Sequence, residues 1–251
     1  MWIFPLAATL VSAFFSGIVL RQYLLRRHPA HLAWSFALFL FGLGTSCDFL
    51  ASVGNWTPLI AKTYYVAGAM VVVGFLALGT LYLLAPLAVA RIWLAAMIVL
   101  SVLAVFFVAR AGIDTAALHS PDQPGWQAID RSTPIKAIMI AINALGTLII
   151  VGGAGYSAIR GRYVRANITI ALGTLLVAGA GSMTALGRAE FNSIGQTAGI
   201  TVMFAGFLMT MAAARARRDS PGDSRGTSDL DVGAAEPIAV EAAETAAPET
   251  V

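Results

Sequence analysis

Seven separate stretches of the 251-residue chain are apolar enough, and long enough, to cross a lipid bilayer. A transmembrane helix needs roughly 20 mostly apolar residues. Lipid offers no hydrogen bonds, so the backbone of each spanning segment must satisfy its own, and these stretches are expected to be helices. The fold class is therefore predicted to be all-α. The seven stretches are residues 2–20, 32–52, 63–84, 92–109, 135–156, 167–186 and 194–214.

The composition agrees with a membrane protein. Hydrophobic residues make up 58% of the chain and charged residues 12%, whereas soluble domains carry about 25% charged residues. We predict that residues 1–218 form one transmembrane domain. Residues 219–251 hold eight acidic residues and a single basic one, Arg225, and lack the apolar mass to fold. This segment is predicted to be a disordered, acidic cytoplasmic tail.

The basic residues fall mainly on one side of the predicted spans. Positive charge near the ends of spans is retained in the cytoplasm. With the N-terminus outside, ten basic residues flank the cytoplasmic ends and five lie on the outer side. The sequence therefore predicts an N-out, C-in orientation. The ten are Arg21, Arg26, Arg27, Arg91, Arg160, Arg162, Arg165, Arg215, Arg217 and Arg218, and the five are Lys62, Arg110, Arg131, Lys136 and Arg188.

Several chemistries are excluded by residue types that the spans lack. Cys47 is the single cysteine, so the chain has no Cys-x-x-Cys redox pair. The last stretch has no lysine for a retinal Schiff base, and the histidines His28, His31 and His119 lie outside the apolar stretches. No nucleophile and base are paired in a recognisable motif. We therefore predict no cofactor, no metal and no enzymatic activity. The net charge of +3 combines a basic membrane part with an acidic tail, so nucleic acid is not an expected partner.

Polar residues gather near the outer ends of the spans. An ionisable group inside a membrane is costly and is a candidate for function by default. Tyr64 and Asn192 lie in the same outer region. An alternative is that the lysines and tyrosines anchor the protein at the interface, and that Asp48 forms an ion pair with Lys62. The predicted ligand-binding residues are Asp48, Lys62, Tyr65, Lys136, Asn143 and Gln196.

Two further patterns concern packing and the long outer loop. The tripeptide Leu-Gly-Thr occurs four times, at residues 43–45, 78–80, 145–147 and 172–174. Small residues allow close helix approach in membranes, and we favour this explanation over an internal duplication, whose register does not match. Residues 110–134 form the one long outer connection, for which a mobile tether is favoured over a lid.

We predict a multi-pass protein of a bacterial plasma membrane, since arginine greatly outnumbers lysine and alanine and glycine are abundant. Its predicted role is non-enzymatic binding or sensing of a lipid or small amphiphile from the outer side. The alternative is a small transporter or permease subunit. A structural partner of another membrane protein is a third possibility. Membrane lipids are expected partners, as is a membrane or cytoplasmic protein, and the oligomeric state stays open.

Overall fold

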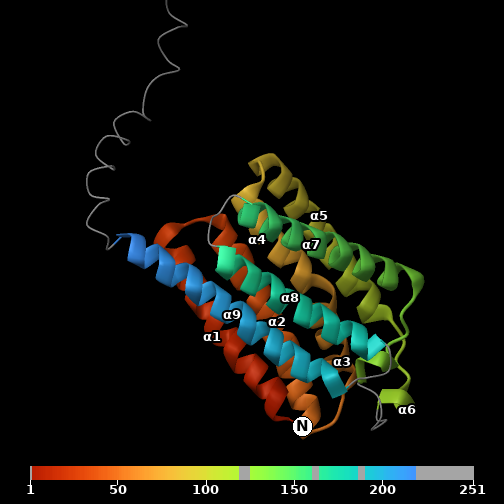
Figure 1. Cartoon of the computed structure of the whole chain (residues 1–251). Coiled ribbons are helices and arrows are strands. Elements are labelled where there is room, and N and C mark those ends of the chain that lie inside the picture. The colour runs from red at the N-terminus through yellow and green to blue at the C-terminus, as the bar shows by residue number, and fades with distance from the viewer. Residues whose placement is uncertain (1, 119–124, 160–163, 186–189, 219–251) are drawn as a thin grey trace, which may run out of the picture. The chain divides into compact units, whose positions relative to one another are not determined.

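The computed structural model describes residues 2–118, 125–159, 164–185 and 190–218, and these residues are almost entirely helical (Figure 1). Over this part of the chain, extended pairing is limited to one antiparallel bridge between Ile113 and Ile129. The predicted all-α fold is therefore confirmed. The elements are α1 (Ile3–Arg26), α2 (Pro29–Val53), α3 (Pro58–Thr63), the π-helix η1 (Tyr64–Val71), α4 (Val72–Leu84), α5 (Leu87–Arg110), α6 (Thr115–Leu118), the 3-10 helix η2 (Gly125–Ala128), α7 (Thr133–Ile159), α8 (Val164–Ala185) and α9 (Glu190–Arg218).

Five helical segments of the described residues are long and apolar enough to cross a membrane. One of them joins α3, η1 and α4, which follow one another without a break. The last two predicted stretches coincide with α8 and α9. The described apolar segment there is Ile168–Val177 of α8, which is shorter than the five spanning segments. The structure is thus that of a membrane-embedded helical protein. The five segments are Ile3–Arg26, Pro29–Val53, Pro58–Leu84, Leu87–Arg110 and Thr133–Ser157.

Local sequence signals set the ends of the first helices. Arg27 takes a left-handed conformation (φ 54°), and its N–H donates to the carbonyl of Tyr23, which closes α1. Two residues later Pro29 opens α2, with the His28 side chain accepting from the Ala30 N–H. Proline suits the first turn of a helix because it lacks an N–H that would have no partner there. The turn between α1 and α2 is therefore encoded by the residues Arg27, His28 and Pro29.

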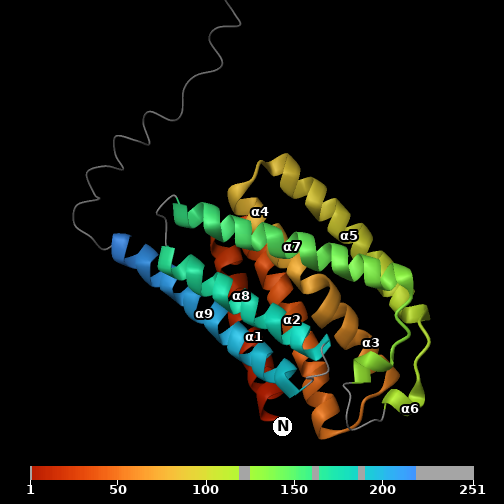
Figure 2. The same cartoon turned by 45° about the vertical axis from the view of Figure 1, so that its right-hand side comes forward.

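In both views α5 lies at one edge of the helical assembly, and α1 and α9 lie at the opposite edge (Figures 1 and 2). The 58–84 segment is central: half of the residues in its most apolar stretch are buried, against 17% of those in the corresponding stretch of α5. Helix α2 packs against α1 and α4, and α7 packs against α4, α5 and α8. On α9, Phe204 and Phe207 contact Phe15 of α1, with ring centroids 4.9 and 5.0 Å away. Outward-facing side chains such as Ile92 and Val102 are apolar and more than 60% exposed, as suits contact with lipid.

Residues Met1–Met209 form one compact unit, and the last described residues of α9, from Thr210 to Arg218, lie outside it. The predicted acidic tail, residues 219–251, lies outside the described residues.

All four Leu-Gly-Thr glycines lie at close helix contacts. A Cβ added to Gly44 would stand 2.7 Å from the Cα of Gly68, and one added to Gly146 would stand 3.0 Å from the Val73 carbonyl oxygen. At Gly173 the same addition would approach the Gly199 carbonyl oxygen to 2.6 Å, and at Gly79 it would collide with the indole of Trp34. Helix packing therefore accounts for the repeated tripeptide, as the sequence suggested.

The connection between α5 and α7 folds back on itself, so the expected mobile tether is wrong for its described part. The Asp130 N–H donates to Gly112 (2.9 Å) and the Asp114 N–H donates to Ala128 (3.0 Å). Leu118 and Ile129 are buried in the apolar core. Backbone pairing and buried aliphatic side chains hold this connection against the helices, and residues 119–124 lie outside the description.

Candidate functional site

Asp48 and Tyr64 stand one helical turn beyond the closest approach of α2 and η1. The two backbones meet at Gly44 and Gly68. A short connection makes α2 and the 58–84 segment antiparallel. Asp48 follows Gly44 by four residues and Tyr64 precedes Gly68 by four, so both lie on the same side of the crossing. Residues four apart share a helix face. The crossing therefore brings a carboxylate and a phenol together at one end of the helices.

Helix α9 supplies the hydrogen-bond partners of both groups. The Ser193 hydroxyl donates to Oδ2 of Asp48 (2.8 Å). The Tyr64 hydroxyl accepts from the Asn192 amide (2.9 Å) and from the Gln196 amide (3.0 Å). The Gln196 amide also donates to Oδ1 of Asn192 (3.1 Å). We call these five residues, Asp48, Tyr64, Asn192, Ser193 and Gln196, the outer polar cluster, after the side of the membrane that the sequence predicts for them.

The accessibility of the cluster differs between its members. Tyr64 is 4% exposed and Asn192 is 7% exposed, so their hydrogen bonds replace those that water would otherwise make. Asp48 is only partly buried, and its second carboxylate oxygen has no hydrogen-bond partner among the described residues. The cluster thus combines a buried amide–phenol network with a carboxylate that can still accept.

Aromatic side chains from two connections surround Tyr64. Its ring lies 5.8 Å from Trp56, edge to face, and 6.4 Å from Trp126, nearly parallel. Trp126 also stacks on Tyr65 (6.2 Å) and carries the Arg131 guanidinium over its ring at 5.7 Å. The neighbouring Gly125 packs against the Trp56 indole, where a side chain would collide. These two connections therefore place electron-rich ring faces beside Tyr64 of the polar cluster.

The third span has a π-helical stretch beside this site. From Tyr64 to Val71 the turns are wider than in an α-helix, and such segments often occur at functional sites. The Asn143 amide on α7 donates to the carbonyl of Ala69 (3.0 Å) and to that of Met139 (2.9 Å). Asn143 therefore ties α7 to the π-helix, one turn or more from the cluster.

The six predicted site residues are not all brought together. Asp48 and Gln196 belong to the outer polar cluster. The Tyr65 ring stacks on Trp126, which borders the cluster, and the Tyr65 hydroxyl contacts the Met139 sulfur (3.3 Å). Asn143 supports the π-helix, as described above. Lys136 is exposed at the start of α7.

The expected Asp48–Lys62 ion pair does not form. The Lys62 ammonium donates to the carbonyl of Ala109 (2.8 Å), in the last turn of α5. The carbonyl end of a helix attracts positive charge, so this position suits a lysine. Asp48 bonds Ser193 instead. Sequence reasoning missed Ser193, Trp56 and Trp126, although the polar pair Asn192–Ser193 directly before the last apolar stretch was a usable signal.

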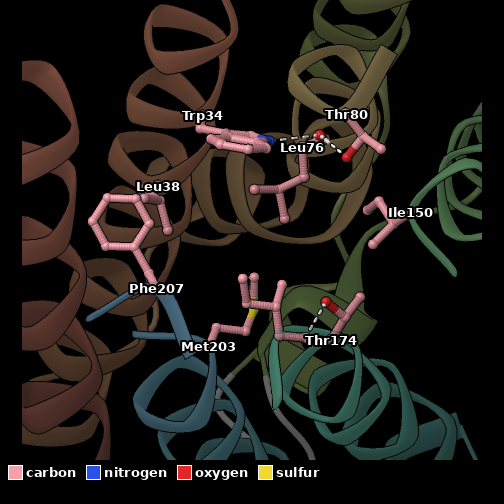
Figure 3. Close-up of a pocket in the computed structure, with 9 residues that line it drawn as sticks. Trp34, Leu38, Leu76, Thr80, Ile150, Thr174, Met203 and Phe207 are labelled. Carbon is pink, nitrogen blue, oxygen red and sulfur yellow. Dashed lines mark hydrogen bonds between the residues drawn. The ribbon is translucent and has the colours of Figure 1, made fainter. Parts of the chain in front are cut away.

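A second feature of the same unit is a pocket between the helices, separate from the outer polar cluster. Figure 3 shows a small pocket of about 70 Å³ between side chains from α2, α4, α7, α8 and α9. Trp34 lies near the start of α2, and Thr80 lies near the end of α4, so the pocket is at the end of these helices opposite to the outer polar cluster. Its lining residues are Trp34, Leu38, Leu76, Thr80, Ile150, Ile170, Thr174, Met203 and Phe207.

The polar groups of this pocket have partners in the protein. The Trp34 indole N–H donates to the carbonyl of Leu76 (3.1 Å), which also accepts from the Thr80 hydroxyl (3.3 Å). The Thr174 hydroxyl donates to the carbonyl of Ile170 (3.0 Å). Satisfied hydroxyls and aliphatic walls leave a pocket that favours apolar occupants over water.

Filling this pocket is expected to stabilise the protein. Thr174→Leu places apolar volume in the pocket and gives up only a bond to its own helix, so we expect a gain of about 1 kcal/mol. Thr169→Leu is the matched control, because Thr169 makes the same bond to Arg165 (2.8 Å) and does not line the pocket. Thermal unfolding in detergent micelles measures both. A Thr174 variant that is no more stable than the Thr169 variant would contradict this description of the pocket.

Among the described residues no three His, Cys, Asp or Glu side chains come together as metal ligands would. The cluster offers hydrogen-bond donors and acceptors and one carboxyl group, beside the aromatic rings that surround Tyr64. Comparison with known proteins found no match among protein-family models, curated proteins or solved structures.

Proposed function

We propose that the chain is a seven-span protein of a bacterial plasma membrane, and that its outer polar cluster binds a lipid headgroup or a small amphiphile. In this proposal the protein is a non-enzymatic binding or sensory protein, with its N-terminus outside and its C-terminus in the cytoplasm. The observation that carries the proposal is the Asp48 carboxylate. It lies within a membrane-type helix, is partly accessible, and has one neutral hydrogen-bond partner, Ser193, in the described structure.

The physical reason is the cost of such a group. A carboxylate at membrane depth is unfavourable by roughly 2.5–3.5 kcal/mol at the bilayer centre, and less near the interface. A structural role would favour several partners, as Tyr64 has in Asn192 and Gln196. An incomplete set with an accessible oxygen is instead typical of a group that receives part of its coordination from a ligand.

The sensory part of the proposal concerns α9. This helix carries Asn192, Ser193 and Gln196, and it is also the last helix before the acidic segment of the sequence. A ligand that takes over hydrogen bonds from Asp48 or Tyr64 acts directly on α9. The basic cytoplasmic end of this helix and the acidic tail would then engage a partner protein.

The orientation rests on the excess of arginine at the proposed cytoplasmic ends. It can be tested with single cysteines in a Cys47→Ala background. We expect Ser132→Cys to react with a membrane-impermeant maleimide in intact cells, and His28→Cys to react only after permeabilisation. The opposite labelling pattern would reverse the topology and move the cluster to the cytoplasmic side.

Binding is tested by the response of the purified protein to a bacterial polar lipid extract. A ligand at about 100 times its Kd stabilises the folded state by ~2.7 kcal/mol. We expect the extract to raise the Tm of wild type. In Asp48→Asn most of this rise should be lost. Asp130→Asn is the matched control, since it removes an exposed carboxylate at the same end of the helices. Equal stabilisation of all three proteins would reject the proposed site.

A small transporter or permease subunit is the second candidate, and the π-helix favours it. Transporter sites often lie beside interrupted helices, and η1 has polar residues on one side and the apolar pocket of Trp34 and Thr80 near the other end of its span. Proteoliposomes that take up the bound amphiphile faster than empty liposomes would support transport. Uptake equal to that of empty liposomes would leave binding or sensing.

A further inference from the structure

We infer that the outer polar cluster selects amphiphiles with a cationic, ammonium-type headgroup, for which Asp48 is the counter-ion and the rings around Tyr64 are the walls. This inference rests on the proposed function, because it names the ligand class of the same site. It is carried by the charge balance of the site and by its aromatic surroundings, which are independent observations.

The charge balance at Asp48 is incomplete. Ser193 is its one hydrogen-bond partner in the described structure, and it is neutral. The described cations of this end are engaged elsewhere or exposed. Lys62 bonds the Ala109 carbonyl, Arg131 lies over Trp126, and Arg110 lies 5.0 Å over the ring of Phe106. A negative charge that no side chain of the described residues neutralises attracts a positive ligand and repels an anionic one.

The aromatic surroundings favour the same sign of charge. Ring faces carry negative potential and attract cations, most strongly when the cation is weakly hydrated, as an alkylated ammonium is. Trp126 already holds the Arg131 guanidinium over its ring. Trp56 and Tyr64 contact each other at 5.8 Å, and the hydrogen bonds of Tyr64 link its ring directly to the helix that bonds Asp48. A carboxylate and an aromatic cluster that are joined through one helix, as Asp48 and Tyr64 are through α9, form an environment that suits an ammonium headgroup.

The test compares three probes that share one alkyl chain. Dodecyltrimethylammonium, dodecyl sulfate and dodecanol are added below their micellar concentrations to the full-length protein in nanodiscs. Binding is followed by tryptophan fluorescence, since Trp56 and Trp126 border the site, and by equilibrium dialysis. We expect the cationic probe to bind tightest, and Asp48→Asn to weaken it by about tenfold or more. Asp130→Asn should leave its binding unchanged.

Two more variants keep the test independent of misfolding. Asp48→Glu retains the carboxylate, so it should keep the preference for the cationic probe that Asp48→Asn loses. Arg188→Gln addresses a cation outside the described residues, and it should also retain binding. Cation selectivity that is the same in Asp48→Glu and Asp48→Asn would overturn Asp48 as the ligand's counter-ion.

The outcomes separate the inference from the proposed function. Asp48-dependent binding of dodecanol or dodecyl sulfate at equal or higher affinity would overturn the cationic selectivity and leave the amphiphile site in place. Binding of no probe in an Asp48-dependent manner would overturn the inference, and the response to the lipid extract would then decide the proposed function. Selective, Asp48-dependent binding of the cationic probe supports both.

Discussion

Gly44→Ala is expected to lower the stability of the protein by roughly 2–3 kcal/mol, the upper part of the range for overpacked sites. The added Cβ would stand 2.7 Å from the Cα of Gly68 and 3.1 Å from its nitrogen. Both atoms belong to the backbone of η1, so no side chain can rotate away. The two helices must separate at the crossing, which also moves Asp48 away from Tyr64. Thermal unfolding in detergent measures the loss, and binding of the lipid extract should weaken in parallel.

The matched control is Gly152→Ala on α7. No atom lies within 4 Å of the Cβ added there. Alanine is the better helix former by up to about 1 kcal/mol, so this variant should be neutral or slightly stabilised. The same chemical change is thus predicted to have opposite signs at the two positions. Equal effects at Gly44 and Gly152 would show that α2 and η1 do not approach each other as described.

Tyr64→Phe is expected to cost about 2–3 kcal/mol, because a buried donor left without an acceptor costs roughly 1–3 kcal/mol. The variant keeps the ring and its contacts with Trp56 and Trp126. It removes the oxygen that accepts from both Asn192 and Gln196, and Asn192 is 7% exposed. The loss should be measured as the free energy of unfolding in mixed micelles.

Tyr82→Phe provides the control for this substitution. Tyr82 is partly exposed on α4, and its hydroxyl has no hydrogen bond in the described structure. Its removal should change stability by less than about 0.5 kcal/mol, as for other surface changes. The double variant Tyr64→Phe with Asn192→Leu removes a donor together with its acceptor and should recover part of the loss. A Tyr64 variant as stable as the Tyr82 variant would exclude the network.

Much of the fold follows from sequence because membrane helices are encoded locally. Five of the seven apolar stretches lie within helices that extend them by a few residues, as when the stretch 63–84 is found to begin at Pro58. The Thr57–Pro58 pair, which caps that helix, was the sequence signal for the earlier start. Asp48 and Gln196 were also accessible to sequence reasoning, since isolated polar groups in apolar helices are conspicuous.

The partners of these residues were not predictable, because they depend on tertiary packing. Asp48 and Ser193 are separated by 145 positions in the chain. Proximity along the chain suggested Lys62 as the partner, yet its long side chain reaches the end of α5, where a carbonyl accepts. The π-helix has no clear signature in residue type. The packing of the connection between α5 and α7 was not predicted. Its proline and glycine residues indicate a turn, but they do not show what the neighbouring Trp126 contacts.

The most direct measurement is native mass spectrometry of the protein, gently extracted from a bacterial membrane, for wild type, Asp48→Asn and Asp130→Asn. The account predicts a discrete adduct on wild type and on Asp130→Asn that is lost from Asp48→Asn, and the mass of this adduct identifies the ligand class. An absent adduct, or one retained by Asp48→Asn, would contradict a binding site at the outer polar cluster. The cluster would then be a structural link between α2, η1 and α9.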